Sequence, residues 1–502
     1  MPFSSAADFQ EALDTVRESF AAGITKNKQW RRHQLKRLWW MVEDNKDAIC
    51  MALYKDLHKH RFESVMTDCA AIQNDIIHTL SMLDRWTADE KPARTDFLNF
   101  IGGTTVRKEP LGVSLIIGAW NYPMLLLLQP LIAALAAGCA VILKPSDVAV
   151  ESQELLMRIV PEYLDQKGVQ IISAGPQEMT YILQHRFNHI FFTGSAGVAK
   201  IVHAAASKHL TPVTLELGGQ GPAIVCKSAN IEVSARRIAA TKFMNAGQIC
   251  LNVNHVLVDP AVKDELVARL GHYFEVFIGE SNQEPSHYTS IINERNFDRL
   301  DGLLQKTKGQ VVYGGNRNRD SLFFSPTIVL VDQDDILLSS EIFGPILPVL
   351  VADLDTALRH TAKGEHPLAI YAFTSKRDEK QYILDHSMSG GVTFNDCFLH
   401  AGAKDAPFGG VGESGMGYYH GPHGILAFSH LRTYMNGLPA WMESAMAFRY
   451  PPYQLANINK MSPTVRPSFD REGNDVGRMG ALMKLAAGLA GLTAVYIFRA
   501  AA

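Results

Sequence analysis

The stretch LGVSLIIGAWNYPMLLLLQPLIAALAAGCAVIL, Leu111 to Leu143, decides the fold and contains no charged residue. Its length alone would suit a membrane span. Turn-forming and helix-breaking residues divide it, namely Gly118, Asn121, Pro123, Pro130 and Gly138. The pieces read as a strand at 112–117, a helix at 125–137 and a strand at 140–143. Strands buried on both faces of a parallel sheet are continuous apolar runs, so the stretch predicts a β-α-β unit.

The same alternation continues along the chain. The helix patterns lie at 151–164, 177–184, 198–207 and 233–244, and the strand patterns at 169–173, 189–192, 213–217 and 223–225. A second set begins beyond Ile231 and includes strands at 256–258 and 367–373, whereas residues 1 to about 100 read as helical. The pattern predicts an α/β fold with two doubly wound, Rossmann-like domains.

Composition excludes several functions. The chain has 502 residues, with 48 Lys and Arg against 51 Asp and Glu, a formal charge of -3. This balance argues against nucleic-acid binding as the main function. The 6 cysteines form no C-x-x-C pair and are too few for a disulfide framework, so we expect no metal site of that kind and a reducing compartment. The first 20 residues do not read as a signal peptide.

Three residues stand where chemistry is expected. Cys250 follows Asn-Ala-Gly-Gln-Ile in a loop after a helix, although a lone Cys is more often a small buried hydrophobe. Glu216 lies in an apolar strand that ends in two glycines, which would suit a general base or a solvent-facing carboxylate. Asn121 follows the first apolar strand, where open α/β sheets bind ligands; it would donate to an oxyanion or simply form a turn.

A phosphate-facing turn is predicted at Thr193-Gly194-Ser195, where a strand ends and a helix begins. The dinucleotide fingerprint G-x-G-x-x-G occurs at none of the predicted β–α turns. Its nearest match, at 410–415, has no strand–helix context and reads as a loop. These residues alone leave the cofactor undecided.

Seven strings in chain order together resemble the aldehyde dehydrogenases. They are GAWNYP (118–123), LKPSD (143–147), FTGS (192–195), LELGG (215–219), GQIC (247–250), EIFGP (341–345) and PFGGVGESGMG (407–417). The resemblance covers about 10–455. The strings GMGYYHG (415–421) and RYPPY (449–453) are similar to the class 3 branch, which includes the fatty aldehyde dehydrogenases.

The resemblance implies a mechanism. Cys250 would attack the aldehyde carbon, while Asn121 and the backbone N–H of Cys250 would hold the oxyanion. Hydride loss to the nicotinamide would give a thioester. Glu216 would then activate the hydrolytic water.

The resemblance also implies an NAD cofactor, with NADP possible, and assigns its contacts. These are Lys144 and Asp147 at the adenosine ribose, Ser195 at the start of the helix that faces the pyrophosphate, Val198 near the adenine, and Glu341 with Phe343 at the nicotinamide ribose. Thr193, Gly194 and Leu217 are expected as further cofactor contacts. Asp147 departs from the family's usual Glu, which leaves the choice between NAD and NADP open. A second departure is Ala199, where the family has Gly. No metal is implied.

The family's domain organisation is expected here. It would place an NAD(P)-binding domain at 1–84 and 109–212, a catalytic domain at 213–417, and a small β bridging or oligomerisation element at 85–108 and 418–445. This element implies a homodimer. Residues 446–478, rich in Pro, Asn and Ser, read as a linker.

Residues 479–498 are apolar except for Lys484, which suits a C-terminal membrane anchor. An interfacial or docked helix is the alternative. The anchor predicts membrane association facing the cytosol, at the endoplasmic reticulum or the mitochondrial outer membrane. Because long alkyl aldehydes partition into lipid, the expected substrates are medium- to long-chain fatty aldehydes.

Three alternatives remain open at this point. The first is an aldehyde dehydrogenase for short or aromatic aldehydes instead of fatty ones. The second is a non-catalytic membrane-tethered scaffold of the same fold. The third is a thioesterase or cysteine hydrolase that uses Cys250. The sequence offers no convincing His partner for the hydrolase.

Overall fold

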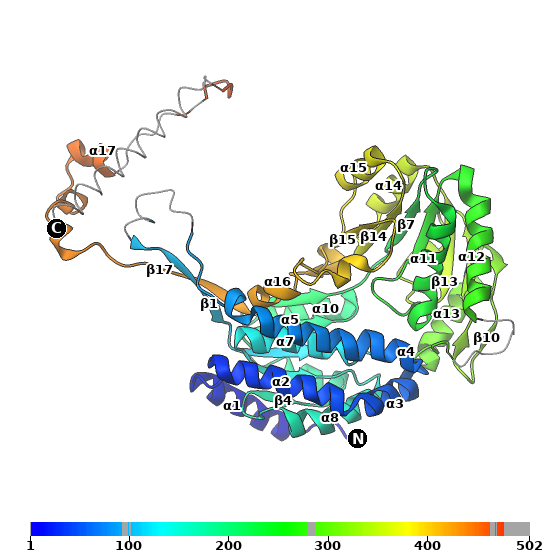
Figure 1. Ribbon diagram of the computed structural model, residues 1–502, viewed down its shortest axis with the longest axis horizontal. Coiled ribbons are helices and arrows are strands. Elements are labelled where there is room, and N and C mark those ends of the chain that lie inside the picture. The colour runs from blue at the N-terminus through cyan, green and yellow to red at the C-terminus, as the bar shows by residue number, and fades with distance from the viewer. Residues whose placement is uncertain are drawn as a thin grey trace. The chain divides into compact units, whose positions relative to one another are not determined.

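The computed structural model describes residues 2–92, 99, 102–278, 287–461, 467 and 469–475. Chain contacts divide it into two units (Figure 1). One unit comprises 1–91 and 105–434 and contains both large sheets. The other comprises 92–104 and 435–502.

The first sheet has six strands in the order β16-β6-β5-β2-β3-β4. Their bounds are β2 Val113–Ile117, β3 Ala140–Lys144, β4 Val169–Ile171, β5 His189–Thr193, β6 Val213–Glu216 and β16 Gly415–Met416. All neighbours pair in parallel except β16, which runs antiparallel to β6. Every residue of β2, β3 and β5 is buried, which explains the continuous apolar runs.

Helix α7 (Leu125–Ala137) joins β2 to β3, which confirms the predicted β-α-β unit. It ends at Gly138, whose φ of 99° is the left-handed conformation that favours glycine at a helix end. The other helices of this half cover the sheet or lead up to it (Figure 1). They are α1 Ala6–Ala21, α2 Lys28–Asp44, α3 Lys46–Leu57, α4 Arg61–Ser64, α5 Ala71–Trp86, α8 Val150–Tyr163, α9 Pro176–Ile182 and α10 Ala196–Ser207.

The second sheet has seven strands in the order β15-β14-β7-β8-β13-β12-β9. Their bounds are β7 Pro222–Val225, β8 His255–Val258, β9 Gln310–Tyr313, β12 Thr327–Val331, β13 Ile346–Val351, β14 Ala369–Phe373 and β15 Gly391–Phe394. Only β9 is antiparallel to its neighbour. The helices of this half are α11 Ile231–Phe243, α12 Lys263–Ile278, α13 Glu294–Lys306, α14 Leu354–Lys363 and α15 Arg377–Asp385 (Figure 1).

Two strands of the predicted catalytic domain (213–417) pair within the first sheet. The prediction began the catalytic domain at residue 213, but β6 pairs in parallel with β5 and therefore belongs to the first sheet. Strand β16, also expected in the catalytic domain, pairs with β6 and closes the edge of the same sheet. Strand order is set by pairing across the sheet, which the local sequence pattern does not contain.

Strands β1 (Thr105–Pro110) and β17 (Ser429–Tyr434) form a separate antiparallel ribbon. They overlap the two segments predicted for oligomerisation, although β1 extends two residues past the expected end at 108. Helix α16 (Gly421–Ala427) precedes β17, and β10 (Arg317–Asn318) pairs with β11 (Phe323–Phe324).

In the second unit, the described part of the predicted linker contains short helices, the last being α17 (Ile458–Met461), and an isolated antiparallel bridge between Phe469 and Asp475. The predicted membrane anchor at 479–498 lies outside the described residues. Over the described ranges, no helix has the length and apolar character that crossing a bilayer requires.

Candidate active site

A cavity of about 1130 Å³ brings the predicted site residues together. All of them line it: Asn121, Lys144, Asp147, Thr193, Gly194, Ser195, Val198, Glu216, Leu217, Cys250, Glu341 and Phe343. Those on the first sheet come from the carboxyl ends of β2, β3, β5 and β6 or the loops that follow. This is the edge where open α/β sheets bind their ligands.

Cys250 lies on a tight loop beyond α11. The 3-10 turn Met244–Gly247 holds Asn245 and Ala246 at φ 50° and 49°, which is unusual for residues with a side chain. A methyl group on Gly247 would collide with the carbonyl oxygen of Gly344, so the loop needs glycine there. Cys250 is half-buried, while the other five cysteines are fully buried.

The electrostatic surroundings of Cys250 favour the neutral thiol. Burial, followed by the nearby carboxyls of Glu341 and Glu216, raises the pKa of the thiol to about 12. A thiolate in this cavity therefore needs either a base that takes its proton or a positive charge brought close to it.

Glu216, at the end of β6, is only 3% exposed, which excludes the solvent-facing alternative. Neither of its carboxylate oxygens has a hydrogen-bond partner in the described structure. Burial raises the pKa of this carboxyl well above its usual range. A carboxyl in such a position accepts and releases a proton near neutral pH more readily than an exposed one.

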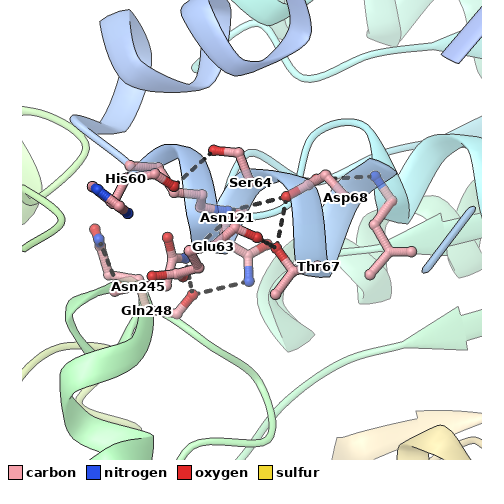
Figure 2. Close-up of polar contacts among 10 residues, drawn as sticks. His60, Glu63, Ser64, Thr67, Asp68, Asn121, Asn245 and Gln248 are labelled. Atoms are coloured by element: carbon pink, nitrogen blue, oxygen red, sulfur yellow. Dashed lines mark hydrogen bonds and ion pairs between the residues drawn. The ribbon is translucent and has the colours of Figure 1, made fainter. Parts of the chain in front are cut away.

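Asn121 follows β2 and is fixed from both its side chain and its main chain. Its Nδ2 donates to the carbonyl of Gln248 at 3.0 Å, and its own carbonyl accepts from Nδ2 of Asn245 at 3.1 Å (Figure 2). Asn245 also donates to the Gln248 carbonyl, at 3.0 Å. These bonds tie Asn121 to the loop of Cys250, and one amide hydrogen of Asn121 remains for a ligand.

The turn from β5 into α10 forms a surface suited to a phosphate. Ser195 caps α10 with extended backbone and makes no side-chain capping bond, so the first N–H groups of the helix remain for an anion. The buried hydroxyl of Thr193 has no partner in the described structure. Further along α10, Val198 and Ile201 are 47% and 65% exposed and line the cavity as an apolar platform.

Two further pairs border the cavity. Nζ of Lys144, at the end of β3, lies 2.7 Å from Oδ1 of Asp147, which presents a donor and an acceptor suited to sugar hydroxyls. On the opposite side, burial raises the pKa of Glu341 to about 7, against the opposing effects of a Gly219 N–H bond, Arg299 and Lys242. Phe343 has a φ of 46°, and its ring makes an edge contact with Trp120 at 5.3 Å.

The family model described as "Aldehyde dehydrogenase family" matches residues 1–434. The chain belongs to the aldehyde dehydrogenase family. It is 40% identical over 452 residues to aldehyde dehydrogenase family 3 member B1 of Rattus norvegicus, covering 90% of this chain and 96% of the relative. It is also 40% identical to the rat enzyme named "Aldehyde dehydrogenase, dimeric NADP-preferring", over 89% of this chain and 98% of that one.

The solved structures agree with this assignment. An AldH of Staphylococcus aureus, solved in a substrate-bound state, superposes with a TM-score of 0.83 at 34% identity. The match covers 88% of this chain and 99% of that one. The comparisons therefore place this aldehyde dehydrogenase in the family 3 branch.

Sequence reasoning missed several residues that organise the site of this aldehyde dehydrogenase. Asn245 and Gln248 stand inside the quoted string before Cys250, and their polar side chains in an otherwise small-residue loop were the available signal. Lys242 is fully buried, donates to the carbonyl of Gly344 at 3.1 Å, and has its pKa lowered to about 7 by burial. Nothing in the local pattern of α11 marks Lys242 as different from a surface lysine.

Proposed function

We propose that this aldehyde dehydrogenase oxidises aldehydes to carboxylic acids through a covalent intermediate on Cys250. The observation that carries the proposal is the meeting of Cys250, Glu216 and Asn121 in one cavity, which extends along the Ser195–Ile201 platform. A nucleophile, a buried carboxyl and a fixed amide donor are the groups that acyl transfer through a thiol requires.

Each residue has one task in the proposed reaction. Cys250 first gives its thiol proton to a base, and the resulting thiolate adds to the aldehyde carbon to form a thiohemiacetal. The free amide hydrogen of Asn121 stabilises the oxyanion that forms in this step. After the thioester has formed, Glu216 takes a proton from water, which attacks the thioester carbonyl. The carboxylic acid then leaves and the Cys250 thiol is regenerated.

We infer that the cofactor is NAD or NADP. When bound, it accepts the hydride whose loss converts the thiohemiacetal into the thioester. The structure fits such a group because Thr193 and the α10 N-terminus offer free donors, and Val198 and Ile201 offer an apolar face. Lys144 and Asp147 would bind ribose hydroxyls, and Glu341 with Phe343 would hold the opposite ribose. The words "NADP-preferring" in the name of one rat relative support including NADP.

The finer assignments rest on the sequence of the C-terminal segment. Medium- to long-chain fatty aldehydes are the proposed substrates, because the apolar stretch 479–498 would bring the enzyme to lipid, where such aldehydes concentrate. We place the enzyme on the cytosolic face of the endoplasmic reticulum or the mitochondrial outer membrane. A homodimer is proposed, supported by the word "dimeric" in the name of a rat relative.

The decisive experiment follows NAD(P)H formation at 340 nm with the Cys250→Ser variant. We expect a loss of more than about 1000-fold, because a serine hydroxyl is a far weaker nucleophile than a thiolate. Cys226→Ser is the matched control, since Cys226 is buried outside the cavity and should retain activity. Undiminished turnover by Cys250→Ser would refute the covalent mechanism, and dinucleotide binding without oxidation in the wild type would favour a scaffold.

Substrate class is tested with hexadecanal, octanal, benzaldehyde and acetaldehyde compared on full-length protein. We expect the highest kcat/KM with hexadecanal. A preference for benzaldehyde or acetaldehyde would keep the enzyme class and reject the fatty-aldehyde assignment. Centrifugation of full-length protein and of a chain ending at Arg478 tests membrane attachment, with only the full-length protein expected in the membrane fraction.

A further inference from the structure

An ion pair between Lys59 and Asp68 is buried behind Asn121 and does not line the cavity. Nζ of Lys59 lies 3.3 Å from Oδ2 of Asp68, and both side chains are 0% exposed. Removing two charges from water costs several kcal/mol per ion, and such a pair seldom adds net stability compared with apolar residues. Net stabilisation of the fold is therefore a poor explanation for this pair, and its contacts point to another role.

The pair contacts the main chain on both sides of the turn that carries Asn121. Lys59 Nζ lies 3.4 Å from the carbonyl oxygen of Asn121 and 3.9 Å from the ring centroid of Tyr122. Oδ1 of Asp68 accepts from the N–H of Leu125, the first residue of α7, at 3.3 Å. The turn is therefore held at its start by the cation and at its end by the anion. Figure 2 shows Asp68 and Asn121 at this place.

Asp68 reaches this place from an irregular helical segment. It lies in the π-helix Val65–Ala70, between α4 and α5, and its Oδ2 also accepts from the hydroxyl of Thr67 at 3.0 Å. π-helical segments are rare and are frequently found at functional sites. Here the segment places a carboxylate against the first turn of α7.

We propose that Lys59 and Asp68 are positioning residues for Asn121, and that their pair fixes the turn from which the Asn121 amide faces the reacting oxygen. The inference rests on the proposed role of Asn121. The carbonyl of Asn121 is bound by Lys59 and Asn245 together, so rotation of that peptide is opposed from two sides. An oxyanion donor acts only if it is fixed in place before the reaction, because reorientation would use up the stabilisation it provides.

The test is the double variant Lys59→Met, Asp68→Asn. It removes both charges of the pair together and keeps an oxygen for the Leu125 N–H, but removes the bond from Lys59 to Asn121. We expect kcat for aldehyde oxidation to fall about 10- to 100-fold with little change in KM, because a transition-state interaction is weakened. Lys55→Met, which breaks the exposed pair with Glu151, is the matched control and should leave kcat unchanged.

Alkylation by iodoacetamide separates positioning from general distortion. This reaction at Cys250 forms no oxyanion, so the double variant should be alkylated at the wild-type rate. Mass spectrometry of the peptide that contains Cys250 measures this rate. If alkylation falls together with oxidation, or if kcat is unchanged, the proposal is overturned. Should the double variant not fold, Thr67→Val removes one bond to Asp68 and should lower kcat a few-fold, with alkylation again unchanged.

Asn121→Ala distinguishes failure of this inference from failure of the proposed function. In that background, the Lys59 and Asp68 substitutions should cause no further loss, since the group they position is gone. If Asn121→Ala itself leaves kcat unchanged, the proposed oxyanion role fails and the inference fails with it. If Asn121→Ala lowers kcat but the pair lowers it equally in both backgrounds, only the inference is wrong.

Discussion

Two walls of the same cavity differ in how firmly they are held. The reaction wall, made by Asn121, Glu216 and Cys250, is mostly buried, and Asn121 in it is bonded through both its amide and its carbonyl. The cofactor wall, made by Ser195, Val198 and Ile201, has exposed apolar side chains and an uncapped helix start. Groups that stabilise developing charge must be fixed beforehand, whereas a binding platform gains from surface that the ligand itself covers.

Glu216→Gln should produce the largest change among the variants that keep Cys250. We expect steady-state turnover to fall by about 10²- to 10⁴-fold, because Gln cannot take the proton of the hydrolytic water. The first turnover should still release NAD(P)H, so stopped-flow absorbance at 340 nm should show a burst followed by a slow phase. Burial raises the pKa of Glu216, so wild-type turnover should increase with pH above the usual carboxyl range, and the variant should lose this increase.

Glu232→Gln is the control for that substitution, because Glu232 lies at the exposed start of α11 and pairs with Arg269. It should keep both burst and steady-state rates. Equal loss of the burst and of the steady rate in Glu216→Gln would mean that Glu216 acts before thioester hydrolysis, for example as the base that deprotonates Cys250.

Asn245 allows the rigidity of the reaction wall to be broken at a single residue. Asn245→Asp keeps the shape and the tolerance of left-handed backbone but removes the donors to the carbonyls of Asn121 and Gln248. We expect kcat to fall about 10- to 100-fold, as misplacement of a reacting group by about 1 Å does. Asn245→Gly is the comparison: it accepts the φ of 50° without strain and also lacks the donors, so an equal loss assigns the effect to the hydrogen bonds.

The difference between the walls also explains what the sequence could predict. Helix α7 has the predicted bounds, because Pro123 and Gly138 are local signals for its two ends. Eleven of the twelve predicted site residues stand inside recognisable strings, and Val198 follows the string FTGS (192–195) by three positions. Lys59 does not stand in such a string, because it lies 62 positions from Asn121 and meets its carbonyl only through the fold, from the segment between α3 and α4. Residues that hold a catalytic side chain in place often act through long-range contacts, and such contacts produce no local pattern in a single sequence.

Substitutions in the cofactor wall should change the binding of NAD(P) and not the rate of the chemical step. Val198→Asp places a carboxylate in the apolar platform that is expected to bind the adenine, so the KM for NAD(P) should rise about tenfold or more with kcat nearly unchanged. Val233→Asp is the control, since Val233 is an exposed valine on α11 outside the cavity. A fall in kcat without a change in the KM for the cofactor would contradict the division of labour between the walls.

The smallest effect is expected at Glu63, whose carboxyl lies close to the Lys59–Asp68 pair (Figure 2). Burial, with Asp68 adding to it, raises the pKa of Glu63 to about 7, against the opposing effects of Lys59 and an Asn245 N–H bond. The folded state therefore holds this proton more tightly than the unfolded state does. Stability is lost as pH rises from the ordinary glutamate pKa of about 4.3, and the loss is complete above pH 7.

Glu63→Gln should remove that dependence, because the amide does not ionise. We expect its Tm to exceed that of wild type only slightly at pH 5 and by at least about 2–4 °C at pH 8, because roughly 1 kcal/mol, less than one pKa unit, already causes that change in a large domain. Differential scanning calorimetry at the two pH values measures the gap. If the difference in Tm between the variant and wild type is the same at pH 5 and pH 8, Glu63 is ionised at both pH values. The polar cluster behind the reaction wall would then be stabilised by the charge of Glu63.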